Sequence, residues 1–301
     1  MRWVGGLAAL AAGAAYAVAC ATPLAAETDE ACTNPNALGV SRTVEIDTTG
    51  GPWLGAPHGD PNLLRPGEVV LTFDDGPIPL TTRKILAALA AECTRATFFM
   101  VGRMATAYPE MVREVLAGGH TVGSHTWSHA NLGAIAPGRV KAQIEMAITA
   151  VQKAAGAPTA PFFRYPYLSS TGASVAYAKR RGLAQLAVDV DSKDYLTRNP
   201  PLMVRRTMTR LKARGRGIIL LHDIHLSTAK AVPDLLAHLR DEGFKIVHLQ
   251  AKAPVETLDI AEASAPDKAP VGERAPRKRA KASASKEAKD TEASPLGWLF
   301  E

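Results

Sequence analysis

Short apolar runs alternate with amphipathic stretches through the middle of the chain, between about residues 63 and 250. This alternation is typical of βα units built around a parallel sheet. Strands are predicted at residues 69–73, 96–101, 121–124, 162–165, 184–188, 218–221 and 245–248. Helices are predicted at residues 81–91, 105–117, 137–155, 173–181, 201–212 and 228–240. Seven strands are too many for a small open unit and one fewer than an eight-stranded barrel needs.

The first residues have the pattern of a secretory signal peptide, with one early arginine, a run of Ala, Gly, Leu and Val, and small residues before Glu27. Cleavage after Ala26 is expected, which makes residues 1–26 the signal peptide and residues 27–62 an N-terminal extension. A lipid anchor at Cys20 is the less favoured alternative, because Ala17 stands where a lipoprotein cleavage box has a larger aliphatic residue. The chain is therefore predicted to be periplasmic or secreted.

Cleavage after Ala26 would leave two cysteines, Cys32 and Cys93, in a protein destined for an oxidising compartment. A single disulfide between them is expected, and it would tie the N-terminal segment to the barrel. The alternative is that Cys93, at the end of an apolar helix, is a small buried thiol.

The net charge of +6 is concentrated near the C-terminus. Residues 266–290 contain eight Lys or Arg and four Asp or Glu, a balance of +4, so the rest of the chain is near neutral and nucleic-acid binding is not expected. Residues 251–301 are rich in Ala, Pro, Lys and Ser and are predicted to be a disordered basic tail. It could be an idle extension, or it could contact anionic envelope polymers electrostatically.

Two adjacent carboxylates close the first predicted barrel strand. The apolar run 69–71 leads into Thr-Phe-Asp-Asp-Gly-Pro, in which Asp74 and Asp75 lie at the strand end. Neighbouring strand residues point to opposite faces, so one carboxylate could hold a metal while the other acts as a base. Fifty residues on, one helical turn would place His125 and His129 on the same face. One Asp and two His leave coordination positions open, as a hydrolytic metal site requires.

Three further segments follow in order: Arg164-Tyr165-Pro166-Tyr167, Asp-Ser-Lys-Asp-Tyr at residues 191–195, and Leu220-Leu221-His222. These three segments and the two motifs above all lie at or just past the C-terminal ends of predicted strands. The loop at 189–194 begins in the same way. Active sites of βα barrels are built at that face. Independent stabilising clusters would have no reason to share one rim.

On these motifs the chain resembles the polysaccharide deacetylase family of the NodB-homology, carbohydrate esterase 4 type, over about residues 63–250. That family removes N-acetyl or O-acetyl groups from glycans. The resemblance implies an α/β fold, a distorted (β/α)7 barrel flanked here by the N-terminal extension and the disordered C-terminal tail.

The resemblance also implies roles for the site residues. Asp75, His125 and His129 would bind the metal, with Zn²⁺ favoured and Co²⁺ or Ni²⁺ as substitutes. Asp74 would be the catalytic base, and Arg164 would pair with it. The same pairing would also suit a purely structural ion pair.

The later motifs imply the remaining roles. The backbone N–H of Tyr167 would stabilise the oxyanion. His222 would protonate the departing amine, and Asp194 would orient its imidazole. Leu220 and Tyr195 would line the acetyl pocket, although Trp is commoner than Tyr at that position in the family.

Other polar residues in the motifs are expected to be structural. Asp189 and Asp191 are assigned to the rim or the loop, outside the catalytic set. His225 is expected to be a loop hydrogen-bonding residue, and His120 a structural one. His248 carries no functional indication.

The predicted activity is the removal of acetate from N-acetylglucosamine units of a β-1,4-linked glycan, with peptidoglycan ahead of chitin-type oligosaccharides. An O-acetyl esterase using the same site is the nearest alternative. A catalytically silent glycan-binding module is less favoured, because a binder would need none of the chemically active residues. The protein is expected to act as a monomer.

Overall fold

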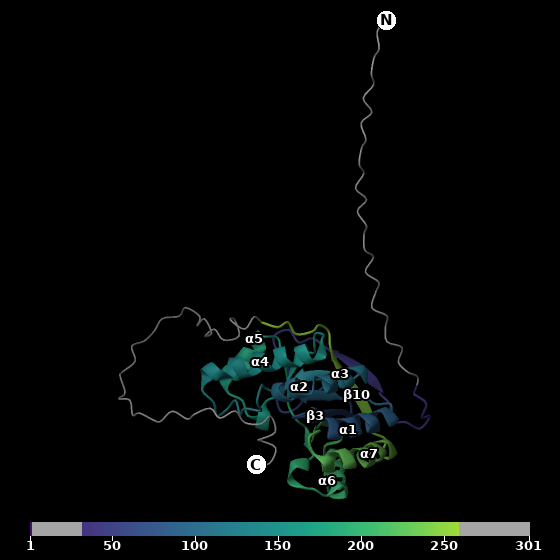
Figure 1. The fold of residues 1–301 in the computed structure, drawn as a ribbon. Coiled ribbons are helices and arrows are strands. Elements are labelled where there is room, and N and C mark those ends of the chain that lie inside the picture. The colour runs from purple at the N-terminus through teal and green to yellow at the C-terminus, as the bar shows by residue number, and fades with distance from the viewer. Residues whose placement is uncertain (2–31, 259–301) are drawn as a thin grey trace, which may run out of the picture. The chain divides into compact units, whose positions relative to one another are not determined.

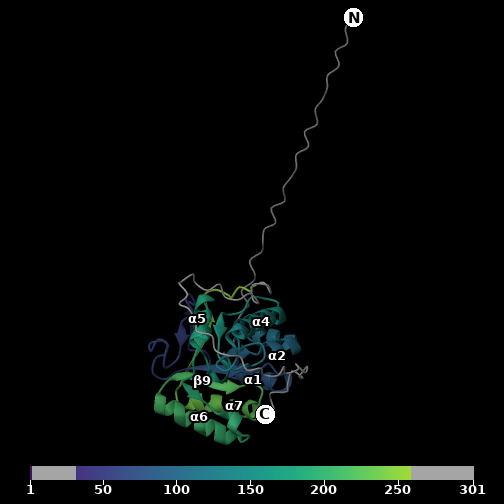
Figure 2. The same ribbon diagram turned by 90° about the vertical axis from the view of Figure 1, so that its left-hand side faces the viewer.

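The computed structural model describes residue 1 and residues 32–258 of the chain. Residues 2–31 and 259–301, which include Cys20, the predicted cleavage site and most of the basic tail, lie outside the described residues. From residue 34 onward, the described part is a parallel sheet with helices packed around it (Figure 1 and Figure 2).

The strands are β1 (Arg42–Ile46), β2 (Trp53–Leu54), β3 (Glu68–Asp74), β4 (Thr97–Met100), β5 (Thr121–Ser124), β6 (Phe162–Phe163), β7 (Ala184–Leu186), β8 (Val190–Asp191), β9 (Gly217–His222) and β10 (Lys245–Ala251). The α-helices are α1 (Pro79–Ala91), α2 (Gly102–Ala107), α3 (Pro109–Ala117), α4 (Pro137–Ala155), α5 (Gly172–Arg180), α6 (Pro200–Arg214) and α7 (Leu226–Asp241). Two 3₁₀ turns, η1 (Pro166–Leu168) and η2 (Asp194–Leu196), lie in the loops after β6 and β8.

Strands β3 to β9 follow one another around a distorted barrel. β3 pairs with β9 on one side and with β4 on the other. Within residues 32–258 no ladder joins β7 to β8, which leaves an opening that we call the β7–β8 seam. The short strand β2 pairs with β7 at this seam. The predicted distorted (β/α)7 barrel is confirmed.

The central strand β3 is buried along its whole length, as expected for a parallel strand covered on both faces. Its Phe73 ring stacks on Phe98 of β4, with ring centroids 5.0 Å apart. Its first two residues pair with β10 and its last three with β4. β10 therefore flanks the barrel between β1 and β3. The strand predicted at 245–248 is real, but the seventh barrel strand is the two-residue β8, which is too short to show a pattern in the sequence.

The predicted helix at 105–117 was wrong as a single element. The structure has two helices there, α2 and α3, separated at Tyr108. Pro109 has no backbone N–H and its ring excludes a continuous helix, so a new helix begins at that residue. The α4 helix has the predicted bounds, and the residue after it, Gly156, has a φ of 69° that suits a left-handed C-cap.

Both segments that flank the predicted domain take part in the fold. β1 and β2 lie within residues 34–62, so much of the predicted N-terminal extension belongs to the sheet. At the other end Val255 is buried, and its N–H donates to the carbonyl oxygen of Thr159 at 2.9 Å. The chain therefore packs against the barrel past residue 251, where the tail was predicted to begin.

Cys32 and Cys93 are both disulfide-bonded, as the predicted bridge requires. The alternative of a buried free thiol at Cys93 is therefore wrong.

No helix in the described part of the chain is long and apolar enough to cross a membrane.

Candidate active site

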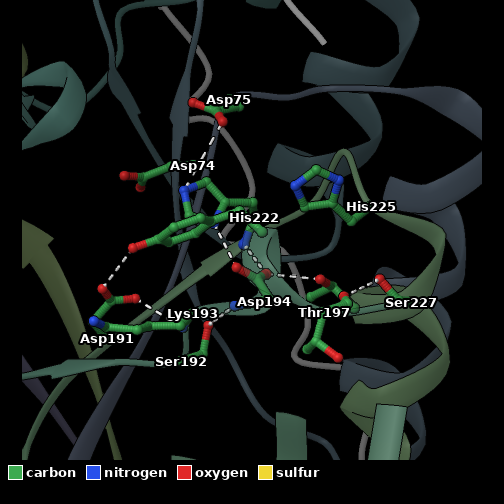
Figure 3. Close-up of polar contacts among 12 residues, drawn as sticks. Asp74, Asp75, Asp191, Ser192, Lys193, Asp194, Thr197, His222, His225 and Ser227 are labelled. Atoms are coloured by element: carbon green, nitrogen blue, oxygen red, sulfur yellow. Dashed lines mark hydrogen bonds and ion pairs between the residues drawn. The ribbon is translucent and has the colours of Figure 1, made fainter. Parts of the chain in front are cut away.

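The sheet register brings the last residues of two strands together at one rim of the barrel. Asp74, the last residue of β3, pairs with His222, the last residue of β9. Asp75 follows directly, and Asp194 lies in η2, just after β8. In Figure 3, His222 lies between Asp75 and Asp194, with contacts of 4.0 and 2.7 Å to their carboxylates.

Asp75, His125 and His129 form a cluster of three potential metal ligands. Nε2 of His125 and Nε2 of His129 lie 3.3 and 3.2 Å from Oδ1 of Asp75. The three ligand atoms all lie within 4.8 Å of one another. Nδ1 of His125 donates to the carbonyl oxygen of Arg164 at 2.8 Å, so the lone pair of its Nε2 faces the cluster.

The Asp75 carboxylate fits a bound cation. Its Oδ1 is buried and accepts no hydrogen bond, although two imidazole nitrogens lie close to it. Buried polar atoms without a partner are uncommon, and one Asp with two His is a usual ligand set for a catalytic metal.

The two histidines meet through a turn, and the prediction of a helical turn was wrong. Thr126 and His129 have left-handed backbone conformations, with φ of 61° and 57°. The N–H of Trp127 donates to the carbonyl oxygen of Gln143 in α4, and the carbonyl oxygen of Thr126 accepts from Gly102 in α2. Because these backbone groups bond to neighbouring helices, the segment cannot form helical bonds of its own.

Unusual backbone conformations gather in the loops around this rim. Asp75 has a φ of 81°, Tyr167 of 57° and Lys193 of 54°, in the loops after β3, β6 and β8. Left-handed conformations cost free energy for residues with a side chain and persist where the surroundings fix them. Such residues often cluster at functional sites, and here they lie beside the proposed metal and acid groups.

Arg164 is fully buried and holds Asp74. Its Nη1 donates to Oδ1 of Asp74 at 2.8 Å and to Oγ1 of Thr72 at 2.7 Å. Its other nitrogens lie 3.3 Å from the carbonyl oxygens of Leu186 and Ala187. A buried guanidinium needs such partners for its charge and its donors. The arrangement leaves Oδ2 of Asp74 on the side of His125, 3.8 Å from its Nε2.

His222 and Asp194 form a second pair, in which Asp194 is buried and His222 is partly buried. Nδ1 of His222 lies 2.7 Å from Oδ1 of Asp194, and the His222 backbone N–H donates to Oδ2 at 2.8 Å. Thr228 also donates to Oδ2, at 2.7 Å. Burial lowers the pKa of His222, but the charge of Asp194 and the more distant Asp75 and Asp74 raise it to about 10. A cation bound at Asp75 would oppose that rise.

The residues predicted to line the acetyl pocket lie around His222. Leu220 is buried in β9, and the Tyr195 ring lies edge-on to the His222 ring, with centroids 5.5 Å apart. The Tyr195 hydroxyl donates to Oδ2 of Asp191 at 3.1 Å, so Asp191 anchors the ring. Tyr167 lies on the other side of the site, and its ring centroid is 4.7 Å from that of His129.

Asp189 does not lie at the active rim. It precedes β8, and its carboxylate accepts from the N–H of Ile218 near the start of β9 at 2.9 Å and from the N–H of Ala56 at 3.1 Å. Arg214 pairs with it at 2.7 Å. The expectation that Asp189 lies with the other motifs at the C-terminal rim was therefore wrong, because Asp189 directly precedes β8 and its carboxylate bonds near the start of β9.

Sequence reasoning missed Asp223, the residue after His222. Its buried carboxylate accepts from the Gly76 N–H at 2.9 Å and from Oγ1 of Thr82 at 2.7 Å, so it fixes the turn that follows Asp75. Burial raises its pKa to about 7. Gly76 could have pointed to it, because a Cβ there would lie 2.1 Å from the Asp223 carboxylate. The turn after Asp75 accepts only glycine, because the Asp223 carboxylate occupies the space that a Cβ would need.

Comparison with known proteins agrees with this geometry. Residues 64–186 match a protein-family model described as polysaccharide deacetylase. Over 180 residues the chain is 34% identical to a peptidoglycan-N-acetylmuramic acid deacetylase of Bacillus subtilis, a match that covers 60% of this chain and 37% of that relative. The match thus spans well under half the length of the Bacillus protein.

Shorter relatives are matched over most of their length. The chain is 30% identical over 203 residues to a chitooligosaccharide deacetylase of Bradyrhizobium, covering 63% of this chain and 91% of the relative. A solved peptidoglycan deacetylase of Bdellovibrio bacteriovorus superposes with a TM-score of 0.65 at 31% identity. That superposition covers 71% of this chain and 59% of the Bdellovibrio chain.

Proposed function

Because this chain belongs to the polysaccharide deacetylase family, we propose that it removes acetate from N-acetylglucosamine units of a β-1,4-linked glycan. Peptidoglycan is the favoured polymer and a chitin-type oligosaccharide the second. One observation carries the proposal: the Asp74–Arg164 and Asp194–His222 pairs flank the Asp75, His125 and His129 cluster at one rim.

Asp75, His125 and His129 would hold a divalent metal, with Zn²⁺ favoured and Co²⁺ or Ni²⁺ as substitutes. When bound, such an ion supplies Lewis-acid polarisation of the acetyl carbonyl and of water. The donor set supports this assignment, because a carboxylate oxygen without a hydrogen bond faces two imidazole nitrogens.

The remaining residues would handle the protons. A water oxygen attacks the acetyl carbon while Asp74, held by Arg164 through Oδ1, accepts a proton from that water. The backbone N–H of Tyr167 would stabilise the oxyanion that forms. His222 then gives a proton to the nitrogen as the C–N bond breaks, so that acetate and a free amine leave. Asp194 holds His222 in the orientation for that transfer.

The His222–Asp194 pair favours an amide over an ester as the substrate bond. An amine leaves poorly unless it is protonated, whereas an alkoxide needs this help less. An acid held charged by a buried carboxylate is therefore more useful to an N-deacetylase. The O-acetyl esterase is the second candidate and would use the same residues.

We place the protein outside the cytoplasm, in the periplasm or secreted. Two observations support this location: Cys32 and Cys93 are disulfide-bonded, and similar proteins include peptidoglycan deacetylases. Structural disulfides persist mainly in oxidising compartments. N-terminal sequencing of the mature protein would test the predicted cleavage after Ala26.

A single assay tests the proposed activity. Acetate release should be measured in parallel from peptidoglycan, chitopentaose and acetylxylan, with and without chelator. We expect release from the two N-acetylated glycans, loss of activity with chelator, and recovery with Zn²⁺ or Co²⁺. Release from acetylxylan alone would make the protein an esterase, and no release from any substrate by the metal-loaded protein would leave the binding module as the function.

A further inference from the structure

The loops after β8 and β9 are tied together by a series of polar contacts. Next to the His222–Asp194 pair, Oγ1 of Thr228 donates to Asp194 at 2.7 Å, and Oγ of Ser227 donates to the carbonyl oxygen of Thr197 at 3.4 Å (Figure 3). One further contact lies beyond them, in which Nη1 of Arg198 is 3.5 Å from Nδ1 of His225. Arg198 and His225 thus extend the row that begins at the proposed acid.

Arg198 has a positive charge without a carboxylate partner. Its side chain is exposed, and no carboxylate of the described residues pairs with it within 4.0 Å. The acidic groups of the neighbouring loop are already engaged. Asp194 pairs with His222, and Asp191 accepts from the Tyr195 hydroxyl. The Arg198 guanidinium is therefore available to a group from outside the chain.

His225 completes a set of donors. Its ring centroid lies 6.1 Å from that of His222, and Figure 3 shows it beside His222 on the side away from Asp191. Burial lowers the pKa of His225, which favours the neutral imidazole. Because arginine can only donate, the contact requires Nδ1 of His225 to accept, which leaves the proton on Nε2. The two residues then offer N–H groups and a positive charge, the features that bind an anion.

We propose that Arg198 and His225 form a subsite for a carboxylate carried at C3 of the sugar that is deacetylated, as in N-acetylmuramic acid. The proposal rests on the proposed deacetylase function and extends it from N-acetylglucosamine to an acidic sugar. In muramic acid the lactyl ether lies on the carbon next to the one that carries the N-acetyl group. Its carboxylate is only a few covalent bonds from the nitrogen that His222 would protonate. The Arg198 guanidinium lies beyond His222 by the length of one imidazole, that of His225, which matches this spacing. A neutral sugar would offer Arg198 and His225 only a hydroxyl at C3.

The test compares substrates that differ in one charge. The metal-loaded full chain is assayed on an oligosaccharide of alternating N-acetylglucosamine and N-acetylmuramic acid with free lactyl carboxylates, and on the same oligosaccharide with those carboxylates converted to amides. We expect kcat/KM to be about tenfold higher for the acid, mainly through KM, as for one charge-assisted contact at an open site. The ratio should fall as ionic strength rises. Mass spectrometry of the product should locate the acetate loss on the muramic acid unit.

Variants assign the effect to Arg198. Arg198→Gln should bring the acid-to-amide ratio close to one, and Arg198→Lys should restore part of it. Arg206→Gln, which removes a charge from an exposed position on α6, should leave the ratio at the wild-type value. The amide substrate serves as an internal reference, so a general loss of activity cancels from the ratio.

Three results would overturn the subsite: a wild-type ratio near one, a ratio that Arg198→Gln does not change, or acetate loss confined to the glucosamine units. Binding of both oligosaccharides to the Asp74→Asn variant, measured by calorimetry, keeps the subsite test independent of turnover. If no substrate releases acetate, the proposed function fails, and the binding ratio still decides the subsite.

Discussion

Two buried histidines far from the active rim should make the stability of this protein fall as the medium becomes acidic. The Nδ1 atom of His120 accepts the backbone N–H of Ala96 at 3.2 Å. Nε2 of His248 donates to Oγ1 of Thr121, which itself donates to the carbonyl oxygen of Leu249. A proton on Nδ1 of His120 would face the Ala96 N–H and break that bond. Burial lowers the pKa of His120 to about 3 and that of His248 to about 4.

These two pKa values set the sign and the size of the change in the free energy of unfolding. A histidine in the unfolded chain titrates near 6.5, so below that pH the unfolded state binds protons that the folded state does not bind. The stabilisation is complete above the unfolded pKa and is lost as the pH falls from about 6.5 towards the folded values. At pH 5, about 1.5 units below 6.5, each histidine should lower the free energy of unfolding by about 2 kcal/mol. Both together are a large part of a typical stability of about 5–15 kcal/mol.

Urea unfolding of the metal-free protein at pH 7.5 and pH 5, with chelator present, measures the effect. His120→Asn keeps an acceptor for the Ala96 N–H, and His248→Gln keeps a donor for Thr121, but neither side chain titrates. Each substitution should reduce the pH-dependent loss by about 2 kcal/mol relative to wild type. His238→Gln, at an exposed position, is the matched control.

Only the difference between variant and wild type is diagnostic. The raised pKa of Asp223 acts in the opposite sense, because its protonated folded form is favoured as the pH falls through about 7. That contribution cancels when the variants are compared with the wild type. If the double variant lost as much stability between the two pH values as the wild type, the reasoning from His120 and His248 would be refuted.

Three other predictions concern the site and the tail. Asp74→Asn should keep the metal and lower turnover by about 10²-fold or more, whereas Asp75→Asn should weaken metal binding, as metal analysis of the purified variants would show; the reverse pattern would exchange their roles. Asp223→Ala should lower the free energy of unfolding by about 2 kcal/mol or more, because the Gly76 N–H and the Thr82 hydroxyl lose their buried acceptor; a denaturation midpoint equal to that of wild type would contradict this. Truncation at Pro266 should leave the rate on a small chito-oligomer nearly unchanged but weaken binding to peptidoglycan sacculi at low salt; equal pull-down at every salt concentration would make the tail an idle extension.

Long periodic elements and strand-end motifs could be predicted from the sequence. The α4 bounds and the β5 bounds agree with prediction, because nineteen residues of helical periodicity and a four-residue segment between His120 and His125 are local patterns. The two-residue strands β2 and β8, which were not predicted, owe their existence to the barrel around them. Such tertiary pairing leaves little trace in the local sequence.

In the candidate site, too, local patterns could be predicted and features decided by tertiary contacts could not. Asp75, His125 and His129 could be expected to converge because their residue types and strand-end positions indicate a metal site. The conformation of the segment that joins the two histidines could not be predicted, because bonds to α2 and α4 decide it. Asp223 was missed for a similar reason. Its role depends on a turn 147 residues away in sequence, and a lone Asp after His222 has no pattern of its own.

The position of Arg164 changes how its substitutions should be interpreted. Its guanidinium joins Thr72 and Asp74 of β3 to the carbonyl oxygens of Leu186 and Ala187, on the β7 side of the β7–β8 seam. One side chain thus crosses the barrel interior and bonds to the edge where backbone pairing stops. A descendant of this protein that had abandoned catalysis would still need an arginine there to stay folded. Retention of Arg164 is therefore poor proof of activity, and an inactive Arg164 variant says little about chemistry until its fold has been measured.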